Sequence, residues 1–186
     1  MPESASKKAT AKHTPLKLDE KALELAKRSL DDGAVVDEKS PWREDIIKLL
    51  NDSLATELVC ILRYKRHHFT ATGLSSPAIA NEFLVHANEE QSHADRLAAR
   101  IVQLGGEPDF NPATLAKRSH ADYNEELDLH AMIRSNLIAE RVAIEAYTQM
   151  IALIGDKDHT TRRLIEQMLE QEPEHADGAD GWRDKS

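Results

Sequence analysis

Two halves of the sequence repeat one spacing of acidic, aromatic and imidazole side chains. In each half a glutamate is followed by a tyrosine at position +7 and by a Glu-x-x-His motif at +33 or +32. These residues are Glu57, Tyr64, Glu90 and His93 in the first half, and Glu140, Tyr147, Glu172 and His175 in the second. The segments SLATELVCILRY and NLIAERVAIEAY also match at leucine, valine and isoleucine. The repeat predicts two helical hairpins, related by a pseudo-twofold axis, that bring equivalent side chains to one central site.

Apolar residues in four segments recur at alternating steps of three and four, the spacing that places side chains on one face of a helix. The predicted helices cover residues 41–69, 76–104 and 124–154, with a fourth from 158 to at least 169. Ser-Pro pairs mark the first two starts, and glycines follow the second and third ends. Residues 107–123 form a connection long enough to cross from one end of a bundle to the other. We therefore expect an all-α, antiparallel four-helix bundle with one long crossover.

The length of 186 residues suits one domain with additional terminal segments. We predict a flexible arm over residues 1–40, in which 19–30 can form a short helix. The bundle is predicted over 41–177 and a tail over 178–186. Cys60 is the single cysteine, which excludes an internal disulfide and a cysteine-built metal site.

The net charge of −9 argues against a generally nucleic-acid-binding surface. The first twenty residues lack the apolar stretch of a secretion signal, and no later run is long enough to span a membrane. We therefore expect a cytoplasmic protein with no membrane partner.

Glutamates interrupt the middle of every apolar face. A buried, ionised carboxylate is costly unless it is paired, hydrogen-bonded or bound to metal. These faces contain no Lys or Arg at the same level, and two divalent cations would balance four carboxylates and two neutral imidazoles. Mixed carboxylate and imidazole ligation favours iron or manganese over structural zinc. The candidate catalytic and metal-binding residues are Glu57, Glu90, His93, Glu140, Glu172 and His175.

With these motifs, residues 41–177 resemble the ferritin-like di-iron proteins, and among them bacterioferritins and the dodecameric, Dps-like ferritins related to them. The resemblance implies terminal ligands Glu57 and Glu140, bridging carboxylates Glu90 and Glu172, and one nitrogen ligand per metal from His93 and His175. It implies a ferritin-like bundle that holds two iron ions per subunit and oxidises Fe(II) with O2 or H2O2. It also implies iron storage and detoxification in a homo-oligomeric shell.

The chain departs from the family pattern at two positions. Bacterioferritins carry a haem-ligating methionine directly after the first bridging glutamate, and Gln91 stands there, so no haem is expected. Pro173 lies inside the second Glu-x-x-His motif, where a proline costs a helix about 3 kcal/mol. A kink there would displace His175 and weaken binding of the second metal. Because no segment for a fifth helix follows, a dodecamer is expected rather than a 24-subunit shell.

Other side chains near the predicted site have more than one interpretation. Tyr64 and Tyr147 either donate hydrogen bonds to ligand carboxylates or supply electrons during oxidation. We interpret His86 as a hydrogen-bonded core residue rather than an extra ligand or proton relay. Cys60 is expected to be a small buried apolar residue, with an oxidation-sensitive thiol as the alternative.

Two other functions remain open from the sequence. The same cluster would suit an oxygen-activating hydroxylase, which requires an apolar channel for an organic substrate. A DNA-protecting shell with an impaired metal site is the other alternative. Its basic arm, with Lys7, Lys8, Lys12 and Lys17, would bind DNA through many copies, although a solubilising arm is the favoured interpretation.

Overall fold

The computed structural model describes residues 18–26, 40–73 and 76–172. The regular elements of these residues are helices: α1 (Glu20–Ala26), α2 (Arg43–Thr70), α3 (Ser76–Gln103), α4 (Leu115–Arg118), α5 (Leu129–Ile154) and α6 (His159–Leu169). The chain divides into two compact units, Met1–Ala34 and Val35–Ser186. The first unit contains α1, which lies within the short helix expected over 19–30, and the site lies in the second.

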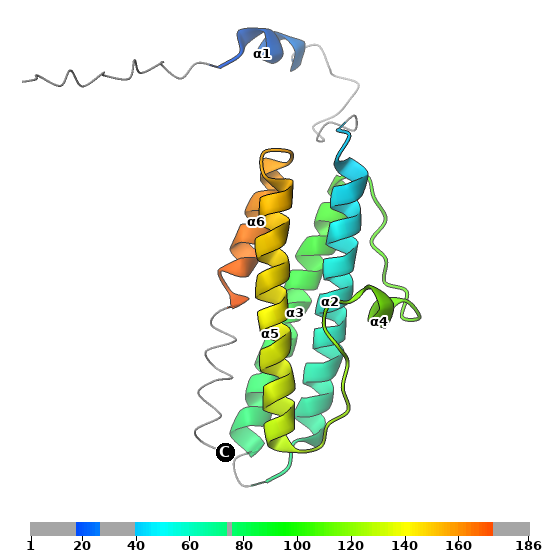
Figure 1. The fold of residues 1–186 in the computed structure, drawn as a ribbon, viewed down its shortest axis with the longest axis vertical. Helices are drawn as coiled ribbons and strands as arrows, with labels where there is room; N and C mark the ends of the chain where they lie inside the picture. The colour runs from blue at the N-terminus through cyan, green and yellow to red at the C-terminus, as the bar shows by residue number, and fades with distance from the viewer. Residues whose placement is uncertain (1–17, 27–39, 74–75, 173–186) are drawn as a thin grey trace, which may run out of the picture. The chain divides into compact units, whose positions relative to one another are not determined.

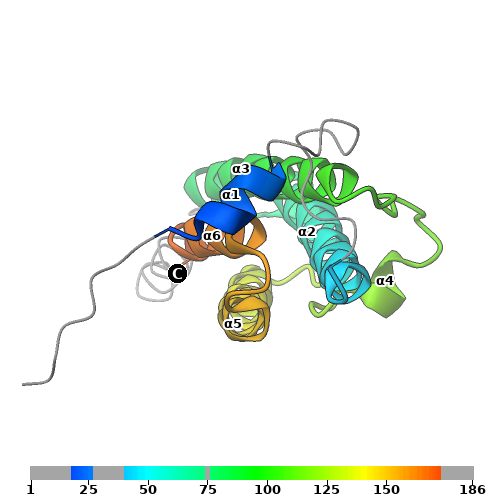
Figure 2. The ribbon, with the colours of Figure 1, turned by 90° about the horizontal axis from the view of Figure 1, so that it is seen from above.

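The four long helices of the second unit lie side by side (Figures 1 and 2). Helices α2 and α3 form one antiparallel hairpin, and α5 and α6 form the other. The connection between the hairpins runs along the bundle beside α2, with α4 on its way, so α5 begins at the end where α3 began (Figure 1). The predicted all-α, antiparallel four-helix bundle with one long crossover is therefore confirmed. Within the described residues, no helix is long and apolar enough to cross a lipid bilayer.

The start of α5 differs from the sequence expectation. The helix begins at Leu129, five residues after the predicted start at 124, because the Asp128 side chain accepts a hydrogen bond from the Ala131 N–H and caps it. Asn124 stays in the crossover, where its side chain bonds His67 Nε2 at 3.1 Å. At the other end, Gly155 follows α5 with a φ of 50°, a left-handed conformation that favours glycine.

The apolar core consists of two main clusters at different levels of the bundle. One includes Leu50, Leu54, Leu97, Ile101, Ile165 and Met168. The other includes Phe83, Met132 and Ile133. Burying each large apolar side chain contributes about 1.5–3 kcal/mol. Residues of the two clusters lie one or two turns on either side of the predicted ligands, so their packing fixes the level of the polar side chains.

Hydrogen bonds with α2 hold the crossover in place. Arg118 Nη1 donates to the Asn51 carbonyl at 2.8 Å, and the His120 N–H donates to Thr56 Oγ1 at 2.9 Å. Further along, the buried Arg63 donates from Nη1 to the carbonyl of Asp122 at 2.8 Å. The crossover is therefore anchored against α2 beside the level of Glu57.

Candidate metal centre

Each of the four long helices, or the residues directly after it, brings acidic side chains to the same level of the bundle. Glu57 lies on α2, Glu90 and His93 on α3, Glu140 on α5, and Glu172 just beyond α6. All five side chains are buried, with at most 2% of each residue exposed. One potential ligand atom from each of Glu57, Glu90, His93 and Glu172 lies within 4.8 Å of the others. Four of the six sequence-predicted ligands therefore converge.

The imidazole of His93 is directed into this cluster. Its Nδ1 lies 3.2 Å from Glu90 Oε2, 3.3 Å from Glu172 Oε1 and 3.8 Å from Glu57 Oε2. On the far side of the ring, Nε2 lies 3.0 Å from Gln171 Oε1. A donor–acceptor contact of this kind fixes which nitrogen faces the metal. The geometry assigns Nδ1 as the nitrogen available to a cation.

Glu140 lies beside the four-residue cluster rather than within it. Its Oε1 accepts a hydrogen bond from the Tyr64 hydroxyl, and Glu57 Oε1 accepts one from Tyr147. Each tyrosine therefore reaches the glutamate of the other hairpin, as expected of two hairpins related by a pseudo-twofold axis. The predicted role of both tyrosines as hydrogen-bond donors is confirmed, whereas electron donation stays a prediction.

The second half-site is described in part. Helix α6 ends at Leu169, and Gln171 N–H donates to the Met168 carbonyl in a tighter turn before Glu172. The predicted ligand His175 and the predicted kink at Pro173 lie outside the described residues.

Burial and mutual repulsion set the protonation of the carboxylates. Burial raises the pKa of Glu90 well above its usual value, and the adjacent negative charge of Glu57 raises it further. Burial likewise raises the pKa of Glu172 to about 8. For Glu57, burial is outweighed by hydrogen bonds from Glu90, His93 and Tyr147, so its pKa is lowered. The directions of these shifts favour the charge on Glu57 and the protons on Glu90 and Glu172 when no metal is bound.

Neighbouring carboxylates also control the protons on the ring side chains. Burial lowers the pKa of His93, but hydrogen bonds to Glu172, Glu57 and Glu90 outweigh it and raise that pKa overall. Burial and the charge of Glu140 raise the pKa of Tyr64, and burial and the charge of Glu57 raise that of Tyr147. Both phenols keep their protons and remain donors. The cluster stores protons that a bound cation would displace.

Two polar residues at the site were missed by the sequence interpretation. Gln171 precedes Glu172 with no periodic signal to mark it. Arg63 is 1% exposed and bonds Asn136 Oδ1 through Nε at 2.8 Å. Its charge opposes the rise in pKa of Tyr64 and Cys60. The apolar face predicted for residues 41–69 includes Tyr64 but not Arg63, which falls on the neighbouring face of the helix. The position of Arg63 directly before a core tyrosine was the one sequence signal that it could be buried.

His86 and Cys60 occupy the positions expected of core residues. The His86 ring stacks on Tyr64 with centroids 5.3 Å apart. Cys60 is buried, and its sulfur accepts from Arg63 Nη2 at 3.5 Å. Burial raises the pKa of the Cys60 thiol well above its usual value. A protonated, enclosed thiol agrees with the small apolar role predicted for it.

The family model described as "Ferritin-like domain" matches residues 47–185. The chain belongs to the ferritin-like family. Among its relatives, a bacterioferritin of Desulfovibrio desulfuricans is 30% identical over 138 residues, covering 72% of this chain and 73% of that protein. A "DNA protection during starvation protein" of Pyrococcus furiosus is 33% identical over 136 residues, covering 71% and 73%.

Solved structures of the ferritin-like family share the fold. A dodecameric thioferritin, the bacterioferritin-related protein of Bacteroides fragilis, is 25% identical with a TM-score of 0.73, covering 86% of this chain and 94% of that one. The D. desulfuricans bacterioferritin, whose di-iron site is described in different catalytic states, is 25% identical with a TM-score of 0.68, covering 78% and 81%. This ferritin-like chain has a cluster of Glu and His residues able to bind metal, in a family of di-iron proteins.

Proposed function

We propose that this chain is a ferroxidase that oxidises Fe(II) with O2 or H2O2 at a two-iron site inside each subunit, and that it stores and detoxifies iron. The observation that carries the proposal is the convergence of Glu57, Glu90, His93 and Glu172 in the core, with Glu140 beside them. Such a cluster of buried acids is costly without cations, and ferrous ions suit its oxygen and nitrogen donors.

The proposed ligand roles follow the two hairpins. Glu57 and Glu140 are terminal ligands, Glu90 and Glu172 bridge, and His93 and His175 supply one nitrogen each. Each ferrous ion gives up one electron; two electrons and two protons convert O2 to H2O2, or H2O2 to two waters. Tyr64 and Tyr147 orient Glu140 and Glu57 during this reaction, while the surrounding apolar clusters limit access of bulk water.

The size of the cavity beside Glu57 favours iron over an organic substrate. That cavity, lined in part by Thr56, Glu57 and Tyr147, has a volume of about 10 Å³, room for about one water molecule. Pockets for drug-sized ligands occupy about 300–1,000 Å³. An organic substrate would not fit in this inner cavity, so the hydroxylase alternative would need the larger outer groove lined by Ile138, Val142 and Leu153 to hold its substrate.

We also propose a homo-oligomeric shell of twelve subunits without haem. A dodecamer of 20.8 kDa chains would have a mass of about 250 kDa. In the position after Glu90, the exposed Gln91 donates to Asp95 Oδ1 at 3.0 Å and offers no thioether to a haem iron. The N-terminal arm, for which DNA binding was the alternative interpretation, lies outside the described residues apart from residues 18–26 and Ser40.

A ferrous titration in air tests the proposed activity. Ferric absorbance is followed from substoichiometric to excess Fe(II), and oxidation should saturate at two irons per chain and then continue as soluble mineral. Glu57→Ala should abolish the fast phase, while the matched control Glu44→Ala, an exposed glutamate of the same helix α2, should retain it. Oxidation no faster than in Glu57→Ala would refute ferroxidase activity. Iron oxidation that saturates without forming mineral would favour the hydroxylase. Sedimentation of the same sample measures the number of subunits in the assembly.

A further inference from the structure

Three cavities meet at one residue of the crossover. Two are open grooves of about 480 and 550 Å³ on either side of the crossover residue His120, and the third is the cavity of about 10 Å³ beside Glu57. His120 lines all three of them, and Ala146 lines both the first groove and the inner cavity. His120 and Ala146 therefore stand between the exposed surface and the cavity beside Glu57.

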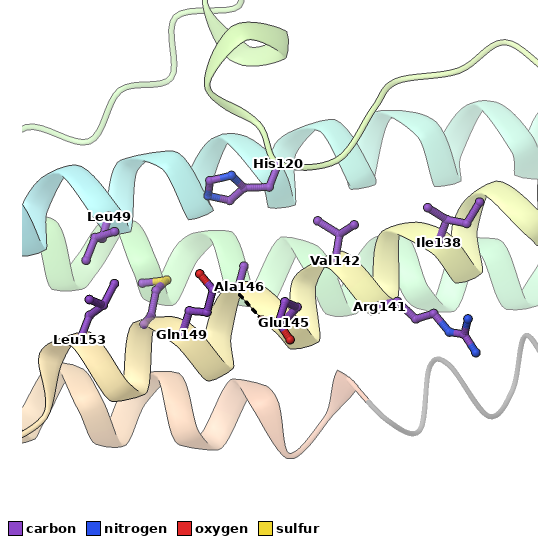
Figure 3. Close-up of a pocket in the computed structure, with 10 residues that line it drawn as sticks. Leu49, His120, Ile138, Arg141, Val142, Glu145, Ala146, Gln149 and Leu153 are labelled. Carbon is purple, nitrogen blue, oxygen red and sulfur yellow. Dashed lines mark hydrogen bonds between the residues drawn. The ribbon is translucent and has the colours of Figure 1, made fainter.

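We propose that ferrous iron enters the metal centre between α2 and α5, and that His120 binds the ion first, before it passes Thr56 and reaches Glu57. This route rests on the proposed ferroxidase function and adds residues that the ligand motifs do not include. The route begins at the outer groove, which is lined mainly by residues of α5. The His120 ring lies across this groove from them (Figure 3).

The donors along this route suit a cation. The imidazole of His120 and the carboxylate of Glu145 line the outer groove. Ser53, Thr56 and Glu57 line the inner cavity, and the Thr56 hydroxyl donates to the Asp52 carbonyl and accepts from the His120 N–H. Imidazole and oxygen donors in sequence are ligands that Fe(II) accepts.

The second groove is less suited to a cation. Its acidic residues already have basic partners, since Lys48 Nζ lies 2.5 Å from Asp52 Oδ2 and Arg118 Nε lies 3.2 Å from Asp109 Oδ2. Lys117 also lines this groove and adds positive charge. In the second groove Lys48, Lys117 and Arg118 outnumber Asp52 and Asp109, whereas the first groove has one basic residue, Arg141, and one acidic residue, Glu145. The α2–α5 groove is therefore the entry we assign.

Small side chains keep the inner passage open. Ala143 and Ala146 lie one turn apart on α5, and both line the inner cavity. A larger side chain at Ala146 would fill a space of about one water molecule without replacing a ligand. The backbone N–H of His120 is bonded to Thr56, so the crossover holds the ring at the entrance.

Two variants of the full-length protein test the route by stopped-flow Fe(II) oxidation. Ala146→Leu should slow oxidation at least about tenfold at all iron concentrations, which corresponds to about 1.4 kcal/mol in the barrier. His120→Ala should raise the half-saturating Fe(II) concentration several-fold and leave the rate at saturation close to that of the wild type. The matched control Ala152→Leu, at an exposed position of α5, should behave as the wild type.

Anaerobic Co(II) binding separates the route from the proposed activity. Both variants should bind the same amount of Co(II) at equilibrium as the wild type, with slower association. Wild-type association rates in both variants would overturn the route, whether or not the protein oxidises iron. The wild type could fail to oxidise Fe(II) while Ala146→Leu still slows Co(II) entry. That result would refute the ferroxidase proposal and support the route. A wild type that binds no Co(II) would overturn both.

Discussion

The buried tyrosines connect the two hairpins at the level of the metal centre. Tyr147 of α5 donates to Glu57 of α2, and Tyr64 of α2 donates to Glu140 of α5. Because both phenol pKa values are raised by burial and by carboxylate charge, the hydroxyls are fixed as donors. Each glutamate therefore presents one oxygen to a tyrosine and keeps the other for a second partner.

Removing one phenol hydroxyl should weaken metal binding. Tyr147→Phe leaves Glu57 without a donor that orients it, and loss of such an outer partner typically costs about 10–100-fold in metal affinity. Anaerobic Co(II) titration should show that loss, and Tyr64→Phe should show a similar loss through Glu140. Tyr123→Phe, at a 43% exposed residue, is the control and should bind normally. Equal affinity in all three variants would show that the tyrosines only fill space.

His67 should make stability depend on pH. Its ring is fully buried between Asn124 and Asn136, and burial, assisted by the charges of Arg63 and Arg66, lowers its pKa to about 4. An unfolded histidine has a pKa of about 6.5, so below that pH the unfolded chain takes up a proton that the folded protein refuses. Neutral, buried His67 therefore contributes to the free energy of unfolding in full above about pH 6.5. As the pH falls towards 4 this contribution is lost, which lowers the free energy of unfolding by about 1–2 kcal/mol after solvent screening.

Urea unfolding of the wild type and His67→Gln at several pH values measures this effect. The stability advantage of the wild type should shrink between pH 7 and pH 4.5. The control His159→Gln, at an exposed residue, should keep a constant difference from the wild type. A wild-type advantage that grows on acidification would contradict the assigned direction.

At the scale of the helices, the sequence predicted most of what positions the site. Apolar periodicity located the four long helices because each one buries a continuous face, and the repeat identified Glu57, Glu90, His93 and Glu172 as neighbours. The start of α5 was wrong because Asn124 and Asp128 are both capable caps, and only a tertiary contact with His67 decides between them. Arg63 was missed since its partners come from α5 and the crossover, which local spacing does not contain.

The start of α6 depends on a buried ion pair. Asp158 caps the helix through the Thr161 N–H at 2.9 Å, and its Oδ2 lies 2.9 Å from Nη2 of the buried Arg100. Burial would raise the pKa of Asp158, but hydrogen bonds from Thr161 and Arg100 outweigh it and lower that pKa. The carboxylate therefore stays charged and holds α6 against α3.

Asp158→Ala should destabilise the protein by about 3–5 kcal/mol, because it removes a cap and leaves Arg100 buried without this carboxylate. The matched variant Asp128→Ala removes the exposed cap of α5 and should cost only about 1 kcal/mol. Urea unfolding compares the two. Equal losses would mean that the pairing with Arg100 contributes nothing beyond capping.

At the scale of the whole bundle, apolar packing holds together side chains that repel one another. The clusters around Leu54 and Phe83 fix the helices on both sides of the acidic level, so the carboxylates cannot separate to relieve their charge. Protons on Glu90 and Glu172 relieve it without metal. Stability and metal binding are therefore linked through the same few protons.

A redox-stable divalent ion should stabilise the folded protein, and more so at higher pH. Burial raises the pKa of Glu172 to about 8, so the metal-free folded protein keeps a proton that the unfolded chain loses above about pH 4.5. The stability of the metal-free folded protein therefore falls as the pH rises from about 4.5 to about 8. A bound cation replaces that proton, and fewer protons compete with it at high pH. At about 100 times its dissociation constant, Co(II) should add about 2.7 kcal/mol, with a larger effect at pH 8 than at pH 6 for the same Co(II) concentration. Thermal unfolding with and without Co(II) measures this gain in stability. Glu57→Ala should lose most of the gain. A gain in stability that diminishes with rising pH would show that the ion binds elsewhere.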